Sequence, residues 1–196
     1  MEALILAAGS STRMGRDKLL LPFGERTVLS SVIDSAVEAG FYPVIMVISP
    51  KTAKSLTKQY KDAVLVINDR SDLGQSFSLK LGIQRMDKSS DFCILLGDMP
   101  TITGRDLLKL LKCFSLRPPE KTALMPLRDG RFGHPSLYEA IWKERFSKAE
   151  GDIGGRDCVR EFADEVLFIK GEDNCFVDVD TPEDYRLLLE RSLRKR

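Results

Sequence analysis

Short apolar runs of strand length alternate along the chain with segments of helical periodicity. The apolar runs lie at residues 4–8, 43–48, 63–67, 92–96 and 122–126. Helices are expected over residues 28–37, 52–60, 75–86 and 106–114, and Gly40 supplies a stop after the first of them. Buried strands that alternate with helices predict right-handed crossovers, and therefore a mainly parallel twisted sheet flanked by helices.

The pattern changes in the second half of the chain. Asp129-Gly130 has the chemistry of a tight hairpin, so we expect an antiparallel excursion of the sheet there. A helix is expected over 137–147, closing strands over 165–169 and 176–179, and a last helix that opens at Pro182. No repeat, low-complexity tract or linker interrupts the sequence. We therefore expect residues 1–196 to form a single domain.

The first apolar run breaks abruptly into a loop of small residues and two cations. Residues 4–8 are followed by Gly9-Ser10-Ser11-Thr12, and then by Arg13 and Lys18. Small residues allow the backbone to approach a ligand with its N–H groups, and the paired cations make a polyphosphate the simplest ligand. The glycine spacing fits neither a P-loop nor a dinucleotide fingerprint. An ordinary polar loop between a strand and a helix is the structural alternative.

Two carboxylates at the ends of expected strands are candidate metal ligands. Asp98 follows the apolar run 92–96, at the edge where parallel sheets bind ligands, and a carboxylate there suits Mg²⁺. Asp98 could equally order the turn before Pro100. Asp180 lies in a second acidic segment with Asp178. On local evidence Asp180 or Thr181 is more readily interpreted as a helix cap before Pro182, which does not exclude a metal role.

Other candidates depend on weaker local signals. Gln75 and Ser78 open an expected helix whose free N–H groups could meet a ligand, although a serine N-cap explains them equally well. His134 is the only histidine, and a lone histidine is most often structural. Asp152 lies in a glycine-rich stretch.

The amino-acid composition limits the expected partners and the expected cellular location of the protein. Hydrophobic residues make up 43% of the chain and charged residues 30%, as in a globular protein, and 30 basic residues balance 29 acids. This balance gives no reason to expect nucleic acid or membrane as a partner. The four cysteines show no metal-site or disulfide spacing, and no signal peptide is evident, so a cytoplasmic location is expected.

Several motifs, in this order, resemble those of nucleotidyltransferases of the molybdenum-cofactor and sugar-nucleotide kind. The motifs are Leu-Ala-Ala-Gly followed by Arg-Met-Gly and Lys, Leu-Gly-Asp-Met-Pro, Gly-His-Pro, Gly-Asp-x-Gly and Asp-Thr-Pro-Glu-Asp. The resemblance implies a Rossmann-like (GT-A-like) α/β fold and the transfer of NMP from an NTP with release of pyrophosphate. It implies that Mg²⁺ is held by Asp98 and Asp180.

The resemblance also assigns roles around the nucleotide. The loop that wraps the triphosphate corresponds to Leu6, Ala7, Ala8, Gly9, Ser10, Ser11, Arg13 and Lys18. Arg13, Lys18 and Asp98 would be catalytic. Gln75 and Ser78 would lie near the base and ribose, and His134 and Asp152 beside the acceptor.

The likeness is greatest to molybdenum cofactor cytidylyltransferases. Relatives that transfer GMP carry Leu-Ala-Gly-Gly in the first motif, so Ala8 favours CTP. The acceptor implied is molybdopterin, with a molybdoenzyme as the recipient of the product. The same chemistry with GTP or with a sugar or polyol phosphate, and a non-catalytic carrier of the cofactor, are the alternatives.

Overall fold

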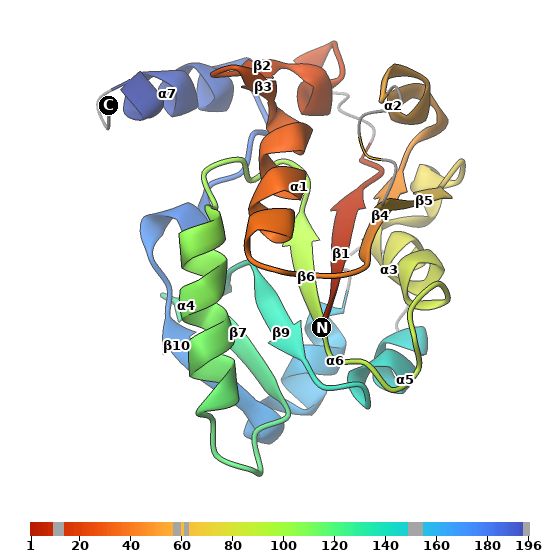
Figure 1. Ribbon diagram of the computed structural model, residues 1–196, viewed down its shortest axis with the longest axis vertical. Helices are drawn as coiled ribbons and strands as arrows, with labels where there is room; N and C mark the ends of the chain where they lie inside the picture. Colours follow the sequence, from red (N-terminus) through yellow and green to blue (C-terminus); the bar gives the residue numbers. More distant parts are fainter. Residues whose placement is uncertain (10–13, 57–59, 61–62, 149–154, 194–196) are drawn as a thin grey trace.

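The computed structural model describes residues 1–9, 14–56, 60, 63–148 and 155–193, with side chains through Glu190 (Figure 1). Within these residues one mixed sheet has the strand order β10-β7-β9-β6-β1-β4-β5, with β8 paired to β7. The strands are β1 (Glu2–Ala7), β4 (Val44–Ile48), β5 (Ala63–Ile67), β6 (Phe92–Leu96), β7 (Ala123–Arg128), β8 (Arg131–Phe132), β9 (Ser136–Tyr138) and β10 (Val166–Lys170). A separate two-stranded ribbon joins β2 (Pro22–Phe23) and β3 (Arg26–Thr27).

The centre of the sheet is parallel. Strand β1 pairs in parallel with both β4 and β6, and β4 pairs in parallel with β5. Strands β4 and β6 are almost entirely buried, which explains why their sequences are continuous apolar runs rather than alternating ones. The parallel sheet flanked by helices, with an antiparallel excursion after β7, confirms the fold class predicted from the sequence.

The antiparallel excursion differs in detail from the prediction. Strand β9 lies between β6 and β7 and pairs antiparallel with both, so the helix expected over 137–147 is wrong in its first half. Leu137 and Tyr138 are buried on opposite faces of the sheet, as successive strand residues must be. Only the second half of that segment is helical, as α5 (Trp142–Ser147).

Helices cover both faces of the sheet (Figure 1). Helices α1 (Val28–Glu38) and α4 (Gly104–Ser115) contribute to the core on one face, and α3 (Gln75–Ile83), α5 and α6 (Arg156–Glu161) to the core on the other. Helix α2 (Pro50–Ser55) follows β4, and α7 (Pro182–Leu193) ends the described chain. Short 3-10 helices are η2 (Lys18–Leu20), η3 (Ser71–Leu73), η4 (Ala163–Glu165) and η5 (Asp173–Phe176).

Three other expected elements need correction. The helix expected over 52–60 is α2, which begins earlier because Ser49 caps it and Pro50 occupies its first turn; residues 57–59 lie outside the described residues. The helix expected to reach about 86 ends at Ile83. The strand expected over 176–179 is not formed, because this segment pairs with no strand among the described residues.

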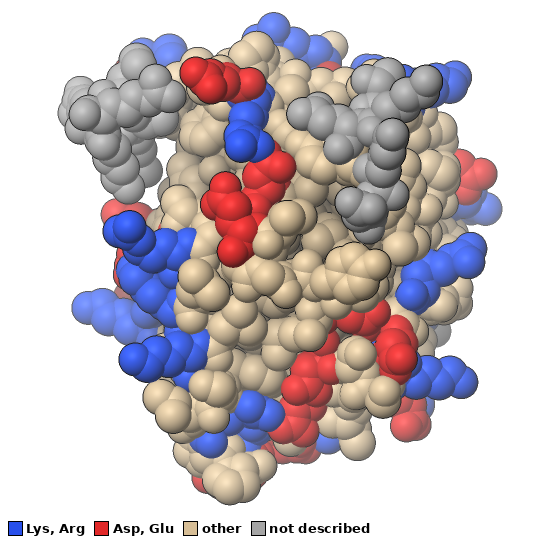
Figure 2. All heavy atoms as spheres, in the orientation of Figure 1, with Lys and Arg blue, Asp and Glu red and all other residues tan. Residues whose placement is uncertain are grey.

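A third, smaller apolar cluster lies apart from the two cores. It consists of Met14, Leu21, Val28, Val179 and Leu188, and we call it the terminal cluster. It packs residues from the start of the chain against α7 and the segment before it. Over the face seen in Figure 2, acidic and basic side chains are intermingled, in keeping with the balanced composition.

Candidate active site

The carboxyl ends of the two central strands create the place for a site. Leu6 of β1 pairs with Leu96 of β6, and the Gly97 N–H donates to the Leu6 carbonyl at 2.9 Å. Glycine at position 97 allows this close approach, since a Cβ there would lie 2.7 Å from the Cβ of Ala7. The close contact sets Asp98 beside the carboxyl end of β1.

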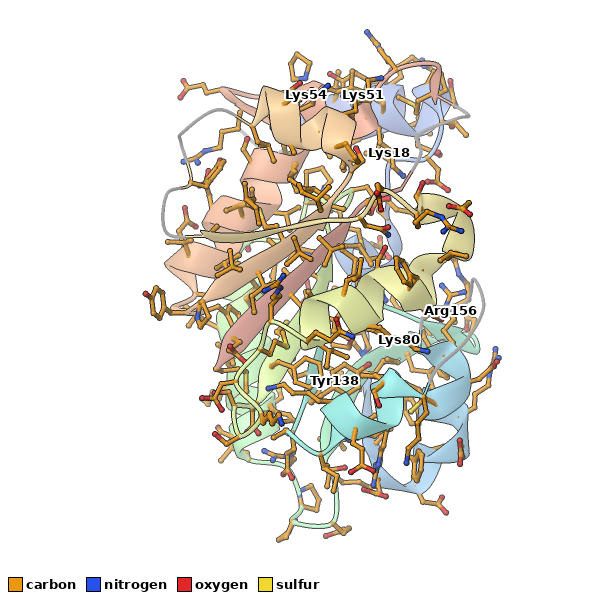
Figure 3. All side chains as sticks on the ribbon, turned by 90° about the vertical axis from the view of Figure 1, so that its right-hand side faces the viewer. Lys18, Lys51, Lys54, Lys80, Tyr138 and Arg156 are labelled. Carbon is orange, nitrogen blue, oxygen red and sulfur yellow. The ribbon has the colours of Figure 1, made fainter. Side chains whose placement is uncertain are left out.

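Lys18 is held at this edge by a capped turn. Asp17 caps η2, because its Oδ1 accepts the Leu19 N–H at 3.1 Å. The other oxygen of Asp17 accepts the Thr52 hydroxyl at 2.9 Å, which fastens the turn to α2. In Figure 3, Lys18 lies just below α2, the helix that carries Lys51 and Lys54.

The ammonium of Lys18 bridges two carboxylates that are far apart in the sequence. Its Nζ donates to Asp98 Oδ2 at 2.6 Å and to Asp180 Oδ1 at 2.7 Å. The side chain of Lys18 is 10% exposed, that of Asp98 19% and that of Asp180 32%. The three charged groups are therefore concentrated in a partly shielded position, where their interactions are stronger than on an open surface.

Backbone contacts bring Asp180 to this position. The Val179 N–H donates to the Asp98 carbonyl at 3.0 Å, and the Val179 side chain is fully buried in the terminal cluster. The helix cap is Thr181, which forms a reciprocal pair with Asp184. Of the two capping candidates, Thr181 therefore caps α7, and the Asp180 carboxylate points to Lys18.

Neighbouring charges shift the pKa values of Lys18 and Asp178. Burial lowers the pKa of Lys18, but Asp98 and Asp180 outweigh this effect, so the net pKa is raised and the ammonium stays charged. The pKa of Asp178 is raised, first by desolvation of its carboxyl and then by the negative charges of Asp98 and Asp180. The negative charges of Asp98 and Asp180 therefore act on Asp178, whereas Asp180 is the residue that accepts the hydrogen bond from Lys18.

The pair of carboxylates fits a divalent cation that also binds a substrate. Asp98 and Asp180 already neutralise one cation, the Lys18 ammonium. In the described part of the chain, no group of three or more His, Cys, Asp or Glu side chains could hold a metal by itself. Mg²⁺ commonly takes one or two carboxylates and completes its shell with phosphates and water, which matches this donor set.

A pocket of about 310 Å³ opens beside Lys18, and we call it the main pocket. Its volume lies in the range of small-molecule sites. Its lining includes eight residues predicted from the sequence, which are Leu6, Ala7, Ala8, Gly9, Lys18, Gln75, Ser78 and Asp98. Sequence reasoning missed Ser71 and Gly74, which also line it. Gly74 has a φ of 82°, a conformation that favours glycine.

One positioning residue was also missed. Asn68 is 1% exposed, and its side-chain amide donates to the Ser78 hydroxyl at 2.8 Å. Its Oδ1 accepts the Arg70 N–H, so the same side chain ties the loop after β5 to the first turn of α3. The sequence did contain a signal for this residue, because Asn68 directly follows the apolar run 63–67.

A smaller pocket adjoins the main pocket, and we call it the side pocket. It has a volume of about 40 Å³ and shares Leu6 and Gln75 with the main pocket. Aromatic and aliphatic side chains form most of its wall. Besides Gln75, its polar side chains include His134 and Arg156. Figure 3 shows Arg156 and Tyr138 beside α3, away from Lys18.

His134 is uncharged near neutral pH. Burial lowers its pKa to about 4, the positive charge of Arg156 contributes in the same direction, and a hydrogen bond with the Ile94 backbone opposes them. The structure therefore places His134 near Arg156, a residue that the sequence analysis did not single out. Four predicted residues, Ser10, Ser11, Arg13 and Asp152, lie outside the described residues.

None of the helices in the described residues combines the length and the apolar character of a membrane span.

Comparison with known proteins identifies related chains. Residues 3–166 match the family of the MobA-like NTP transferase domain. The chain is 28% identical over 203 residues to molybdenum cofactor cytidylyltransferase of Escherichia coli (strain K12), covering 97% of this chain and 96% of the relative. It is also 28% identical over 198 residues to nicotine blue oxidoreductase of Paenarthrobacter nicotinovorans, covering 94% and 95%.

Solved structures agree with this assignment. The structure of Rv0371c from Mycobacterium tuberculosis H37Rv superposes with a TM-score of 0.82 at 27% identity and covers 96% of both chains. A complex of Rv0371c with manganese gives a TM-score of 0.77 at 26% identity and covers 96% of this chain and 97% of that one. The family match spans most of the chain, and its members take an NTP and a phosphorylated acceptor. The chain therefore belongs to the MobA-like NTP transferase family and is a nucleotidyltransferase.

Proposed function

We propose that this enzyme moves CMP from CTP onto the phosphate of molybdopterin, with release of pyrophosphate, and that residues 1–196 act as one domain. The observation that carries the proposal is the meeting of Lys18, Asp98 and Asp180 at the edge of the main pocket. These groups supply the charges that a triphosphate and its divalent cation require. The name of the E. coli relative and the residue Ala8 support CTP and the molybdenum cofactor.

The reaction requires positioning and neutralisation of charge. An oxygen of the acceptor phosphate attacks the α-phosphorus in line, and the bond from that phosphorus to the bridging oxygen breaks. The bridging oxygen keeps the electron pair and leaves as part of pyrophosphate. Residues 6–11 would surround the triphosphate with backbone N–H groups, and Arg13 and Lys18 would stabilise the charge on the leaving group. A phosphate nucleophile is already ionised, so no general base is needed.

Asp98 and Asp180 would hold a divalent cation, which we propose to be Mg²⁺. Their shared bonding to one cation supports this role, as does the manganese complex of Rv0371c. When bound, the metal would polarise the α-phosphate.

The remaining residues would orient the two substrates. Gln75 and Ser78 would face the base and ribose, since both line the main pocket. His134, Asp152 and Arg156 would face the acceptor. His134 is neutral at physiological pH, so it would orient the acceptor by hydrogen bonding rather than carry a proton. The positive charge of Arg156 would suit an anionic acceptor.

The relative from P. nicotinovorans is named as an oxidoreductase. The Lys18–Asp98–Asp180 group supports phosphate chemistry, because each of its members has a direct use with a triphosphate and its metal. Transfer to a sugar or polyol phosphate would use the same three residues, so the acceptor is decided by assay.

Thermal unfolding with CTP, GTP, ATP and UTP, each with MgCl₂, tests the nucleotide. A specific ligand at roughly a hundredfold excess over its Kd raises stability by about 2.7 kcal/mol. We expect CTP to raise the Tm most. A rise with GTP alone would overturn the assignment of the base. Pyrophosphate release with CTP and molybdopterin, compared with a sugar phosphate and a polyol phosphate, then tests the acceptor.

A further inference from the structure

Lys18 occupies the position in which the two carboxylates would hold a metal. One oxygen of Asp98 and one of Asp180 contact the same nitrogen, at 2.6 and 2.7 Å. A divalent ion bound by both carboxylates would lie a few ångströms at most from this ammonium, because the same two side chains would ligate it. Like charges at such a distance repel strongly in a partly buried site. The ammonium and the metal therefore compete for one pair of carboxylates.

The lysine is fixed in this position. Its side chain is 10% exposed, and its turn is capped by Asp17, which is itself bonded to Thr52. A group that attracts the ammonium more strongly must draw it away.

The main pocket offers that group a place. Lys18 lines this pocket together with Gly9 and Asp98, at the carboxyl ends of β1 and β6. A triphosphate seated there would bring several negative oxygens within reach of the lysine, and each would compete with the carboxylates for it. The same movement would withdraw the ammonium from Asp98 Oδ2 and Asp180 Oδ1, the two oxygens that a metal would need.

We infer that Lys18 is a resident cation that keeps metal out of the site until the nucleotide arrives, so that free protein binds divalent metal weakly and the nucleotide opens the metal site. The inference rests on the proposed metal role of Asp98 and Asp180. It gives Lys18 a second task besides holding the triphosphate, and it makes metal binding depend on the nucleotide.

Binding of Mn²⁺ alone, followed by the EPR signal of the free ion, tests this inference on the full chain without nucleotide. Removing the competing charge in Lys18→Met should tighten Mn²⁺ binding by about tenfold or more. Lys18→Arg keeps a cation in place and should bind as weakly as the wild type. Lys54→Met removes a lysine from nearby α2 that has no ion pair within the described residues, and it should change nothing (Figure 3).

Two further measurements make the result decisive. The double variant Lys18→Met/Asp98→Asn should lose the gain, which assigns the ion to this site. If Lys18→Met does not fold, Lys18→Gln serves instead, because its amide can still donate to a carboxylate without carrying a charge. Mn²⁺ binding in the lysine variant that equals or falls below that of the wild type would overturn the inference.

Failure of the proposed function has a different signature. The EPR titration contains neither nucleotide nor acceptor, so a protein that does not transfer CMP could still show tighter Mn²⁺ binding in Lys18→Met. Conversely, wild-type turnover with unchanged Mn²⁺ affinity in the variant would leave the proposed function standing and remove only the resident-cation role.

Discussion

The backbone N–H of Val179 donates a 3.0 Å hydrogen bond to the carbonyl of Asp98. This single contact joins the turn after β6 to the segment before α7. Because Val179 is also fully buried, the segment is fixed on both sides and Asp180 reaches Lys18. The two carboxylates are therefore positioned by main-chain geometry and packing, and not only by their attraction to the lysine.

Removing either carboxylate should abolish most of the activity. We expect Asp98→Asn and Asp180→Asn each to slow pyrophosphate release by about 10²–10³-fold, as for other groups that stabilise charge in a transition state. Both act on one cation, so the double variant should be little worse than the more damaging single one. Asp178→Asn is the matched control in the same segment and should be nearly as active as the wild type. Near-normal turnover of Asp98→Asn would contradict this scheme.

Alanine substitutions at two glycines of the site should have different effects, one on the stability of the protein and the other on nucleotide binding. A Cβ at Gly97 would lie 2.7 Å from the Cβ of Ala7, so Gly97→Ala should lower the free energy of unfolding by about 1–3 kcal/mol. A Cβ at Gly9 would have no neighbour within 4 Å among the residues that the structure describes, so Gly9→Ala should change stability by less than about 0.5 kcal/mol.

Urea unfolding measures the stability of both variants, and thermal shift with CTP measures binding. Gly9→Ala should still weaken CTP binding, because a side chain would hinder the approach of the nucleotide to the backbone. Equal stability of the two variants would mean that the sheet accommodates a methyl group at Gly97.

His134 should make stability depend on pH. Its pKa is lowered from 6.5 to about 4, so the folded protein keeps it neutral while the unfolded chain binds a proton. Stability is then fully present above about 6.5 and falls, as the pH drops toward 4, by up to roughly 3 kcal/mol. Relative to His134→Gln, which cannot titrate, the wild type should lose stability across this window, since the other acids contribute equally to both.

The single histidine also allows a direct check. Its ring protons are the only histidine ring signals in a proton NMR spectrum, so a titration of the folded protein reports this pKa without assignment. Arg156→Gln should raise the value, because it removes a nearby positive charge. A pKa near 6.5 in the wild type would contradict the burial of the imidazole.

The buried pair of Lys143 and Glu2 should be necessary for stability. Lys143 Nζ donates to Glu2 Oε2 at 3.3 Å and to the carbonyls of Ser90 and Asp87, and both charged side chains are less than 10% exposed. Lys143→Met leaves Glu2 without its counter-charge and should cost about 3–5 kcal/mol in urea unfolding.

The exposed pair of Glu144, in the same helix, and Lys148, at its C-cap, provides the control. Lys148→Met should cost at most about 0.5 kcal/mol, because solvent screens that pair. The double variant Glu2→Gln/Lys143→Met should recover part of the loss. Similar losses of unfolding free energy in Lys143→Met and Lys148→Met would contradict this prediction, because burial would then not increase the contribution of the pair of Lys143 and Glu2.

The central strands could be predicted from their local sequences alone. Strands β4 and β6 are covered on both faces, so each is a continuous apolar run that no exposed element would carry. Strand β9 could not be predicted in this way. Leu137 is apolar in either a helix or a strand, and its strand state depends on pairing with Cys93 and Leu124, which are distant in the sequence.

The same limit applies to the site. The motifs indicated Lys18, Asp98 and Asp180 individually, and the main pocket contains most of the predicted binding residues. Whether Asp178 or Asp180 is the second metal ligand was open from the sequence, because alternation puts both on one side of an expected strand. The structure bonds Asp180 to Lys18, and the segment before it is fixed by a hydrogen bond from Val179 to Asp98, which is distant in the sequence. Asn68 was missed because its role depends on contact with Ser78 across a loop.

The terminal cluster joins two parts of the chain that are synthesised at different times. Met14 and Leu21 are made before their partners Val179 and Leu188. The residues that line the main pocket lie between Leu6 and Asp98, so a nascent chain contains all of them before it can present Asp180 to Lys18. We expect a proteolytic cut before Val179 to leave a protein that retains its main core and has lost its chemistry.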